Sequence, residues 1–517
     1  MQLANRFHFL AQTTFRLARA VESSIATRLA TRTTLLALLA LTVVGPVHAQ
    51  IPQFKHIVVI VQENRTPDNL FQGLCIPPYG SGSACGKGAT QYDIVGSGMD
   101  NIGNTVSLLD VPLGNTFDAG HSHAAFNAMC HLNTTTNVCQ MDGLNGTRCD
   151  AGHTNCSFEY VHPQDVEPYI SMAHQYGWAN FMFQTNQGPS SPAHQFLFGG
   201  TSATSAANDA LATFVADNPL NSATGGSGCL AGLGVTYKLI SPATAPNASI
   251  TLVNNQLGDL CFSRPTIPTL LEAKSLGWKY YTNGINNIWS APNWIRDICH
   301  PNPGYTQCTG TEWTSHVALN PATLLTTDLP ACALPAMSWV IPTGQNSDHP
   351  SSDGTHIGGP SWVSSIINTI GISTCTDTIN GKTVPYWQDT AVVVTWDDWG
   401  GFYDHEPPML LSAPNAGQGD YQYGFRVPML FVSAYTPVRY INNNPQDFGS
   451  ILRFVERNFA LGTGEGSLGF ADARSKNGLA KFYDLTQPPR AFTPITAPLG
   501  PEFFINDKRA PDPTDSD

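Results

Sequence analysis

Four short apolar runs, rich in β-branched residues, recur along the chain. They lie at His56–Val61, Met337–Ile341, Ala391–Val394 and Val427–Ser433. Their apolar residues follow one another instead of alternating with polar ones, a pattern typical of strands buried on both faces of a sheet. Apolar positions spaced three or four residues apart predict helices between these runs, at 166–176, 362–370 and 448–460. Strands alternating with helices predict an α/β fold around one central sheet.

Polar residues follow three of the four runs. These residues are Glu63-Asn64, Asp348-His349 and Asp397-Asp398. In open α/β sheets, ligands bind at the carboxyl ends of the strands, so we expect the three pairs at one sheet edge. Adjacent carboxylates repel each other unless a cation lies between them, and carboxylate and amide oxygens are ligands for Ca²⁺, Mg²⁺ and Mn²⁺. The pattern predicts a divalent-metal site, although each pair taken alone also fits a solvated turn or a loop cap.

A serine and a histidine supply candidate chemistry elsewhere in the chain. Ser190 lies in the rigid segment G-P-S-S-P, just before a predicted helix that begins near His194. A hydroxyl at a helix N-terminus lies among free N–H groups, which favour both an alkoxide and an incoming phosphate. His121 and His123 form a His-x-His pair after a glycine and could bind a metal, clamp a phosphate or donate a proton. The alternatives are an N-cap serine and ordinary surface or capping histidines.

These groups together suit the hydrolysis of a phosphoester. A metal would lower the pKa of the Ser190 hydroxyl and orient the phosphate, and a histidine would protonate the leaving alcohol.

The composition and the first 49 residues indicate the cellular compartment of the protein. The chain has 517 residues, of which only 12% are charged, and its 46 Gly and 38 Pro suggest many long ordered loops. Residues 1–49 contain five Arg ahead of the apolar run Leu35–Val44, which is too short to span a bilayer as a stable helix. Val47-His48-Ala49 fits a cleavage site, so we expect a signal peptide at 1–49 and a protein that is secreted or periplasmic.

The charge of the remaining chain limits its partners. Without residues 1–49, which hold five Arg and one Glu, the chain has 20 basic and 37 acidic residues, a net charge of −17. Such a charge argues against binding nucleic acid and against docking on anionic membranes. A metal can still supply positive charge for phosphate chemistry. We therefore expect no nucleic acid and no stable membrane insertion.

All 12 cysteines lie after residue 49, and their even number in an oxidising compartment predicts up to six disulfides. The cysteines cluster locally, although their connectivity stays open. The clusters are Cys75 with Cys85, the four between Cys130 and Cys156, Cys229 with Cys261, Cys299 with Cys308, and Cys332 with Cys375. No C-x-x-C pair occurs, which argues against a zinc cage or a redox motif.

Five segments, in chain order, resemble motifs of the bacterial phosphoesterase family, which holds phospholipases C and respiratory-burst-inhibiting acid phosphatases. The segments are H-I-V-V-I-V-Q-E-N-R at 56–65, D-A-G-H at 118–121, G-P-S-S-P at 188–192, S-D-H-P at 347–350 and T-W-D-D-W-G-G-F-Y-D-H at 395–405. The likeness spans about residues 56–461. It implies an alkaline-phosphatase-like sandwich, with a mostly parallel sheet flanked by helices and with long disulfide-stapled loops.

The resemblance also implies roles for individual residues. A divalent metal ion, which could be Ca, Mg, Mn or Fe, would be bound by Glu63, Asn64, Asp397, Asp398 and Ser190. Ser190 would also be the nucleophile that forms a phosphoseryl intermediate. The histidines that bind phosphate or assist the leaving group would be His121, His349 and His405. His405 could instead support the residues of the site without touching the substrate. His123 and His194 match no position of the family.

Several departures bear on the substrate, which is expected to be a small-molecule or lipid phosphoester. Thr66-Pro67-Asp68 replaces Ser-Phe-Asp, and Asp398 stands where many members have Glu. Ala193-His194-Gln195 replaces the Asn-Arg common in phospholipases, and the sequence ends soon after its last predicted helix. The last two features favour the phosphatase branch. The predicted domains are 1–49, a single catalytic domain at 50–505 and a disordered acidic tail at 506–517.

A second class of function is a secreted binding protein, for example a glycan binder, that keeps the fold without catalysis. A degenerate binder would be expected to have lost one or more of Glu63, Ser190, Asp397 and Asp398, and all four are present.

Overall fold

The computed structural model divides the chain into two compact units, Met1–Ala49 and Gln50–Asp517. The structure describes residues 51–114, 117–136, 138–144, 155–221, 226–241, 249–285, 287–351, 353–412 and 420–510. The predicted signal peptide therefore lies outside the described residues. Of the predicted tail, 506–510 is described and 511–517 is not. No helix in the described segments is both long and apolar enough to span a bilayer.

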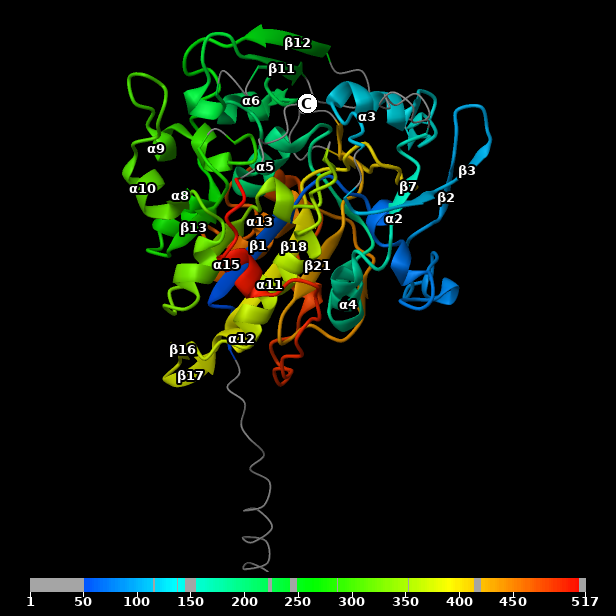
Figure 1. Cartoon of the computed structure of the whole chain (residues 1–517). Helices are drawn as coiled ribbons and strands as arrows, with labels where there is room; N and C mark the ends of the chain where they lie inside the picture. The colour runs from blue at the N-terminus through cyan, green and yellow to red at the C-terminus, as the bar shows by residue number, and fades with distance from the viewer. Residues whose placement is uncertain are drawn as a thin grey trace, which may run out of the picture. The chain divides into compact units, whose positions relative to one another are not determined.

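An eight-stranded sheet forms the centre of the second unit (Figure 1). In spatial order its strands are β14 (Val317–Ala318), β13 (Trp278–Tyr281), β15 (Met337–Val340), β1 (His56–Gln62), β18 (Thr390–Trp396), β21 (Met429–Val432), β8 (Gly177–Ala179) and β22 (Tyr440–Asn442). β21 is antiparallel to both of its neighbours, and every other pairing is parallel. The expected α/β fold with a mostly parallel central sheet is confirmed.

The four apolar runs of the sequence are β1, β15, β18 and β21. Every residue of β1 and β18 is buried, which explains why neither run alternates with polar positions. The two strands pair in parallel along their whole length, from His56 opposite Thr390 to Gln62 opposite Trp396. β15 pairs with the other side of β1. Residues 63, 341 and 397 therefore leave the sheet at the same edge, as predicted.

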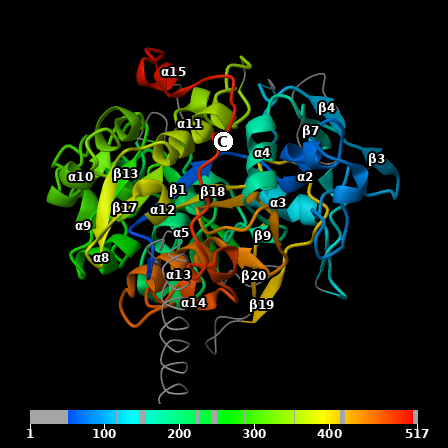
Figure 2. The same ribbon diagram turned by 90° about the horizontal axis from the view of Figure 1, so that it is seen from below.

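Helices cover both faces of the sheet. Figure 2 shows α11 (Gly359–Gly371) and α4 (Glu167–Gln175) on one side of β1 and β18, and α5 (Ser190–Gly199) and α13 (Phe448–Phe459) on the other. The helical spacing that begins at Val166 ends at Gln175, because the residues after it form β8. Shorter helices are α2 (Pro67–Leu70), α3 (His123–Cys130), α6 (Ala206–Ala210), α8 (Ile267–Glu272), α9 (Arg296–Cys299), α10 (Thr311–His316), α12 (Tyr386–Asp389), α14 (Ala471–Arg474) and α15 (Pro501–Ile505).

A small antiparallel sheet lies outside the main one. It is formed by β10 (Phe214–Val215), β11 (Thr236–Ser241) and β12 (Ser249–Asn254). Two-stranded sheets lie in the loops. One of them pairs β16 (Thr376–Ile379) with β17 (Lys382–Pro385). The segment directly after β10 matters for the site, because Ala216 and Asn218 contact the segment that carries Ser190.

Disulfides close the long loops where the cysteines cluster. The bonded pairs are Cys75–Cys85, Cys130–Cys139, Cys229–Cys261, Cys299–Cys308 and Cys332–Cys375. Cys156 is disulfide-bonded as well. Each bond joins cysteines that the sequence had already placed near each other, so the structure supplies the connectivity that the sequence left open.

Candidate active site

The site begins where β1 and β18 end. The backbone N–H of Asn64 donates to Oδ1 of Asp397 at 3.0 Å, and the N–H of Asp398 donates to the same oxygen at 2.8 Å. The N–H of Arg65 donates to the carbonyl of Asp398 at 3.0 Å. Because the strands are neighbours in register, these bonds lock the two polar ends together. Glu63, Asn64, Asp397 and Asp398 are all fully buried there.

Two glycines let further loops close on this strand end. Gly400 has φ of +61°, and a Cβ on it would lie 2.5 Å from the carbonyl oxygen of Asn64. Gly401 has φ of +72°, and a Cβ there would lie 2.5 Å from Cβ of Ala119, two residues before His121. Both positions need a left-handed backbone and lack space for a side chain. The glycine pair therefore brings the segments of Asn64 and His121 against the aspartate pair.

Ser190 reaches the same cluster from the other direction. It is the first residue of α5, after an N-cap at Pro189. Its Oγ donates to Oδ2 of Asp398 at 3.2 Å and lies 3.5 Å from Oε2 of Glu63. The structure thus brings the predicted nucleophile and the predicted carboxylate ligands into direct contact, at a helix N-terminus as expected.

The loop before Ser190 is held by side chains from distant segments. The N–H of Ser191 donates to Oδ1 of Asn218 at 2.8 Å. Nδ1 of His123 lies 2.7 Å from the carbonyl of Gln187, so that nitrogen carries the proton and donates it. A Cβ on Gly188 would lie 2.0 Å from the carbonyl of Ala216. His123 therefore positions the nucleophile segment.

His194 belongs to the cluster although the sequence analysis gave it no role. It lies one turn after Ser190 on α5, and its Nε2 is 3.2 Å from Oε1 of Glu63 and 3.8 Å from Oδ2 of Asp397. Burial lowers the pKa of His194 to about 4, although Asp397 acts in the opposite direction, so the imidazole is neutral. The signal that could have found it is the i, i+4 spacing from Ser190, because such residues share one helix face.

His121 and His349 lie together beside this cluster, with ring centroids 6.5 Å apart. Nδ1 of His121 donates to the carbonyl of Ala119 at 2.8 Å, and Nδ1 of His349 donates to the carbonyl of Pro350. Nε2 of His121 lies 3.3 Å from Nδ2 of Asn64. Each ring is fixed through Nδ1, and Nε2 of His121 faces the Asn64 amide.

Asp348, the residue before His349, holds the loop that carries this histidine. Its Oδ2 accepts from the hydroxyl of Tyr169 and from Nε1 of Trp396, both at 2.9 Å. Its N–H donates to Oε1 of Gln62 at 3.1 Å. These bonds tie the loop after β15 to β1 and β18, and so they position His349.

The structure places His405 in a different cluster. Its Nδ1 lies 2.7 Å from Oδ2 of Asp68, and its Nε2 lies 3.1 Å from Oδ1 of Asp93. Burial alone would lower the pKa of His405, but Asp68 and Asp93 outweigh it and raise the pKa to about 9. No contact within the described part of the chain joins His405 to Ser190 or to the carboxylates around it. Its expected role at the phosphate therefore has no support from the geometry.

Further charges surround His405. Arg426 is fully buried and donates to both oxygens of Asp404, from Nε at 2.7 Å and from Nη2 at 3.0 Å. Lys87 bridges Asp93 at 3.1 Å and Glu406 at 2.7 Å. With two cationic groups already inside it, this cluster is an ion-pair network that joins α2, the loop before residue 94 and the turn after Gly401.

The donors around Ser190 fit a hard divalent cation. Glu63, His194 and Asp397 each offer an atom within 4.8 Å of the others. In the described segments, neither Oδ2 of Asp397 nor Oδ1 of Asn64 accepts a hydrogen bond, although both atoms are buried. Leaving a buried oxygen without a donor is unfavourable, and a bound cation would satisfy both oxygens.

The comparisons with known proteins identify the family of the chain. The sequence profile of the phosphoesterase family matches residues 54–462. The chain belongs to the phosphoesterase family. The match covers every predicted site residue, from Glu63 to His405.

Curated relatives of this phosphoesterase include phospholipases C. A non-hemolytic phospholipase C of Pseudomonas aeruginosa is 22% identical over 460 residues, which are 80% of this chain and 55% of that protein. Phospholipase C A of Mycobacterium tuberculosis is 23% identical over 225 residues, 39% of this chain and 40% of that protein. The chain thus spans about half the length, or less, of these relatives.

Solved structures show only a distant likeness to this phosphoesterase. A protein in the alkaline phosphatase superfamily from Vibrio parahaemolyticus is 11% identical, with a TM-score of 0.31 over 59% of this chain and 62% of that one. The lipoteichoic acid synthase LtaP of Listeria monocytogenes is also 11% identical, with a TM-score of 0.27 over 71% and 75% of the two chains. The fold is therefore assigned from the order and direction of the strands in the central sheet.

Proposed function

We propose that this phosphoesterase is a secreted, metal-dependent hydrolase of phosphoric esters with Ser190 as its nucleophile. The observation that carries the proposal is the position of the Ser190 hydroxyl. It lies at the N-terminus of α5, and its Oγ is 3.2 Å from Oδ2 of Asp398 and 3.5 Å from Oε2 of Glu63. A serine in the first turn of a helix with carboxylates on its hydroxyl is suited to forming a phosphoseryl intermediate.

Glu63, Asn64, Asp397, Asp398 and Ser190 would hold the metal, with His194 as an additional donor. The metal would supply positive charge that favours the alkoxide and neutralises the phosphate. Asp398 accepts the hydrogen bond of the Ser190 hydroxyl and so fixes the position of Oγ. The N–H groups of the first turn of α5 favour negative charge next to Oγ.

The paired histidines would act on the oxygens of the substrate. Nδ1 of His121 and Nδ1 of His349 are both occupied by backbone carbonyls, so a protonated ring would donate from Nε2. That donor can bind a phosphoryl oxygen or protonate the leaving alcohol. The loop that carries His349 is held to β1 through Asp348.

The geometry supports the hydrolysis of phosphoric esters that phosphatases and phospholipases C have in common. The relatives named phospholipase C favour a lipid ester. The first test is steady-state hydrolysis of p-nitrophenyl phosphate and of phosphatidylcholine by the protein from Gln50 onward, with and without a chelator. We expect chelator-sensitive turnover that returns on adding a divalent metal. No turnover of either ester with metal supplied would favour the non-catalytic binding protein.

Replacing the nucleophile provides the second test. Ser190→Ala is expected to lower kcat by roughly three orders of magnitude or more without a loss of thermal stability, because the hydroxyl that attacks is gone. Ser191→Ala is a matched control, since Oγ of Ser191 has no hydrogen-bond partner among the described residues. Equal activity of the two variants would remove Ser190 from the nucleophile role.

Secretion is supported by the disulfides, which persist in oxidising compartments. Expression of the full chain in a secreting bacterial host should yield a protein outside the cytoplasm whose N-terminus is Gln50, as determined by mass spectrometry. Retention of residues 1–49 would contradict the predicted cleavage after Ala49.

A further inference from the structure

A second cluster of candidate metal ligands lies at the opposite edge of the central sheet from Ser190. Its members are His56, the first residue of β1, Asp377 in β16, and Asp389, the last residue of α12. His56 pairs with Thr390 in the parallel register of β1 and β18, so Asp389 comes just before that partner. Figure 1 shows α12, β16 and β17 side by side at this edge. Because β1 spans seven residues at about 3.3 Å each, roughly 20 Å separate the cluster from Glu63.

The ring of His56 has the orientation of a metal-binding imidazole. Its Nδ1 lies 2.8 Å from the carbonyl oxygen of Pro335, so Nδ1 carries a proton and donates it. A backbone carbonyl that accepts from one ring nitrogen is the usual support for a histidine that binds a metal through the other. Nε2 lies 2.8 Å from Oδ2 of Asp377. A neutral ring would direct a lone pair at this oxygen, so the contact needs a positive charge, either a second ring proton or a cation bound by both atoms.

Asp389 is a buried carboxylate without a hydrogen-bond donor. Its side chain is fully buried, and neither of its carboxylate oxygens has a hydrogen-bond partner in the described part of the chain. One of these oxygens lies within 4.8 Å of a ring nitrogen of His56 and of an oxygen of Asp377. Burial, and then the negative charge of Asp377, raise the pKa of Asp389 to about 8. Leaving such a carboxylate without a donor and beside a second carboxylate is unfavourable, and a cation bound by both would relieve it.

Covalent and backbone links hold the three side chains in place. The disulfide Cys332–Cys375 joins the segment of Pro335, which orients His56, to the segment of Asp377. Asp389 is fixed by its position directly before β18. The side chain of Asp377 is 29% exposed, whereas those of the other two are buried. A cation can therefore reach the cluster from solvent on the side of Asp377.

We propose that His56, Asp377 and Asp389 bind a zinc ion, which ties the amino ends of β1 and β18 to β16. One imidazole nitrogen and two carboxylates are ligands that zinc accepts, and water can fill a remaining position on the exposed side. Lys55 acts on both carboxylates electrostatically, but the ion pairs of the described residues join neither of them to a lysine or an arginine. The inference stands apart from the proposed hydrolase activity and does not depend on it.

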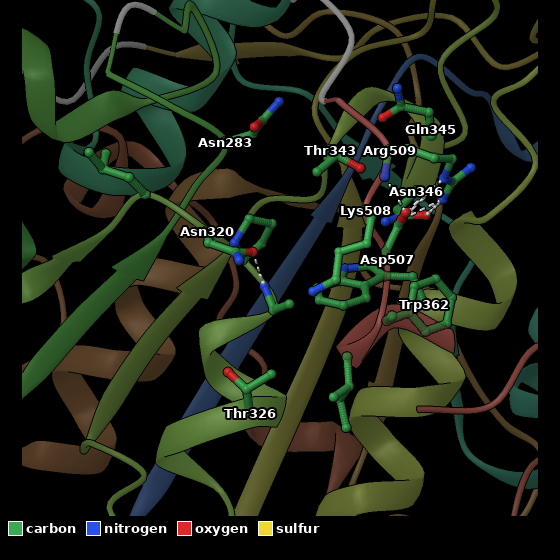
Figure 3. A pocket seen from close by; sticks show the side chains of 15 residues that line it. Asn283, Asn320, Thr326, Thr343, Gln345, Asn346, Trp362, Asp507, Lys508 and Arg509 are labelled. Atoms are coloured by element: carbon green, nitrogen blue, oxygen red, sulfur yellow. Dashed lines mark hydrogen bonds and ion pairs between the residues drawn. The ribbon is translucent and has the colours of Figure 1, made fainter. Parts of the chain in front are cut away.

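The cluster is separate from the other polar features of the sheet. A cavity of about 380 Å³, lined in part by Asn283, Thr343 and Lys508, lies where β13 and β15 end and shares no residue with the cluster (Figure 3). The metal donors around Ser190 form a group of their own at that same carboxyl edge. The difference in bound metal between the wild type and a variant of the cluster therefore reports on the cluster alone, even if zinc also binds near Ser190.

Metal analysis by mass spectrometry, after dialysis against Zn²⁺ and removal of the free ion, tests this proposal. Asp389→Asn keeps the shape of the side chain but removes its charge, and Asp377→Asn does the same at the partly exposed position. Each variant is expected to hold one zinc ion fewer per chain than the wild type, because affinity at the cluster should fall about 100-fold or more. Asp297→Asn, at an exposed position on α9, is the matched control and should hold the wild-type number.

Thermal unfolding distinguishes a bound ion from a proton shared by the two carboxylates. Without added metal, Asp389→Asn should be at least as stable as the wild type, because the variant lacks an uncompensated buried carboxylate. With Zn²⁺ added, the wild type should unfold several degrees higher than the variant, since an ion that binds only the folded state stabilises it. Equal zinc content of the wild type and both cluster variants, or a difference in unfolding temperature that Zn²⁺ leaves unchanged, would overturn the proposal.

Discussion

At the scale of single residues, the site depends on how closely a few groups approach each other. Asp397 accepts from two backbone N–H groups through Oδ1, which leaves its Oδ2 directed toward His194. Gly400 lies against the backbone of Asn64. Small changes at these positions therefore act on the donor set directly.

Replacing His194 with another ring of similar size tests whether its nitrogen belongs to the metal donors around Ser190. His194→Phe keeps a ring in the fully buried position but removes the nitrogen 3.2 Å from Oε1 of Glu63. We expect metal affinity to fall by about 10–100-fold, as for other residues that support metal ligands. Metal content measured by mass spectrometry after dialysis checks this; unchanged content and activity would show that His194 only fills space.

The close approach at Gly400 gives a second prediction. Gly400→Ala places a methyl group 2.5 Å from the carbonyl oxygen of Asn64 at a left-handed backbone position. Gly381→Ala is the control, since its φ of +75° carries similar strain and nothing lies within 4 Å of its Cβ. Gly381→Ala should lose about 1 kcal/mol of unfolding free energy from backbone strain alone, and Gly400→Ala should lose more because its methyl group also meets Asn64. Only Gly400→Ala should also lose metal affinity and activity, which urea unfolding and kinetics would separate.

At the scale of elements, the nucleophile segment is rigid because three separate parts of the chain hold it. His123 from α3 donates to Gln187, Asn218 accepts from Ser191, and Ala216 packs against Gly188. None of these partners is near Ser190 in sequence. The precise placement of the hydroxyl is therefore a property of the assembled loops, not of the G-P-S-S-P segment.

His123→Phe is expected to lower kcat about tenfold or more, because misplacing a reacting group by a fraction of an ångström is costly. The ring stacks on Phe126, with centroids 6.2 Å apart, so a phenyl group should be accommodated while the donor to Gln187 is lost. Asn127→Ala, which removes only the contact to Nε2 of His123, should keep nearly full activity. A change in KM without a change in kcat would contradict a positioning role.

At the scale of the whole molecule, buried charge joins segments that are far apart. The cluster around His405 links α2, the loop of Asp93 and the turn after Gly401 with Arg426 ahead of β21. The groups that face His405 are Asp68, Asp93, Asp404, Arg426, Lys87 and Glu406. Breaking such a network by removing one partner leaves a buried charge uncompensated.

The pKa of His405 makes stability depend on pH. The folded state raises this pKa from 6.5 to about 9, so the stabilisation is fully present below pH 6.5 and is lost as the pH rises through 9. The loss attributable to this group is on the order of 3 kcal/mol. Urea unfolding of wild type and His405→Gln at pH 6, 7.5 and 9 should show a shallower decline for the variant. His131→Gln, at an exposed imidazole, is the control, and equal slopes for all three would contradict the prediction.

The sequence by itself determined the central strands and much of the site. Consecutive β-branched residues can be buried only inside a sheet covered on both faces, so β1, β15 and β18 were readable from local pattern. The polar residues at their ends then had to share one edge, and the structure places Glu63, Asp397 and Ser190 together there. The cysteine clusters were equally local.

Only the tertiary structure decided the positions that depend on contacts between distant segments. His194 joined the site because the first turn of α5 lies against the ends of β1 and β18, whereas His405, close in sequence to Asp397, contacts Asp68 and Asp93 from distant segments. Local pattern fixes which side chains leave a strand, but long-range packing fixes which of them meet.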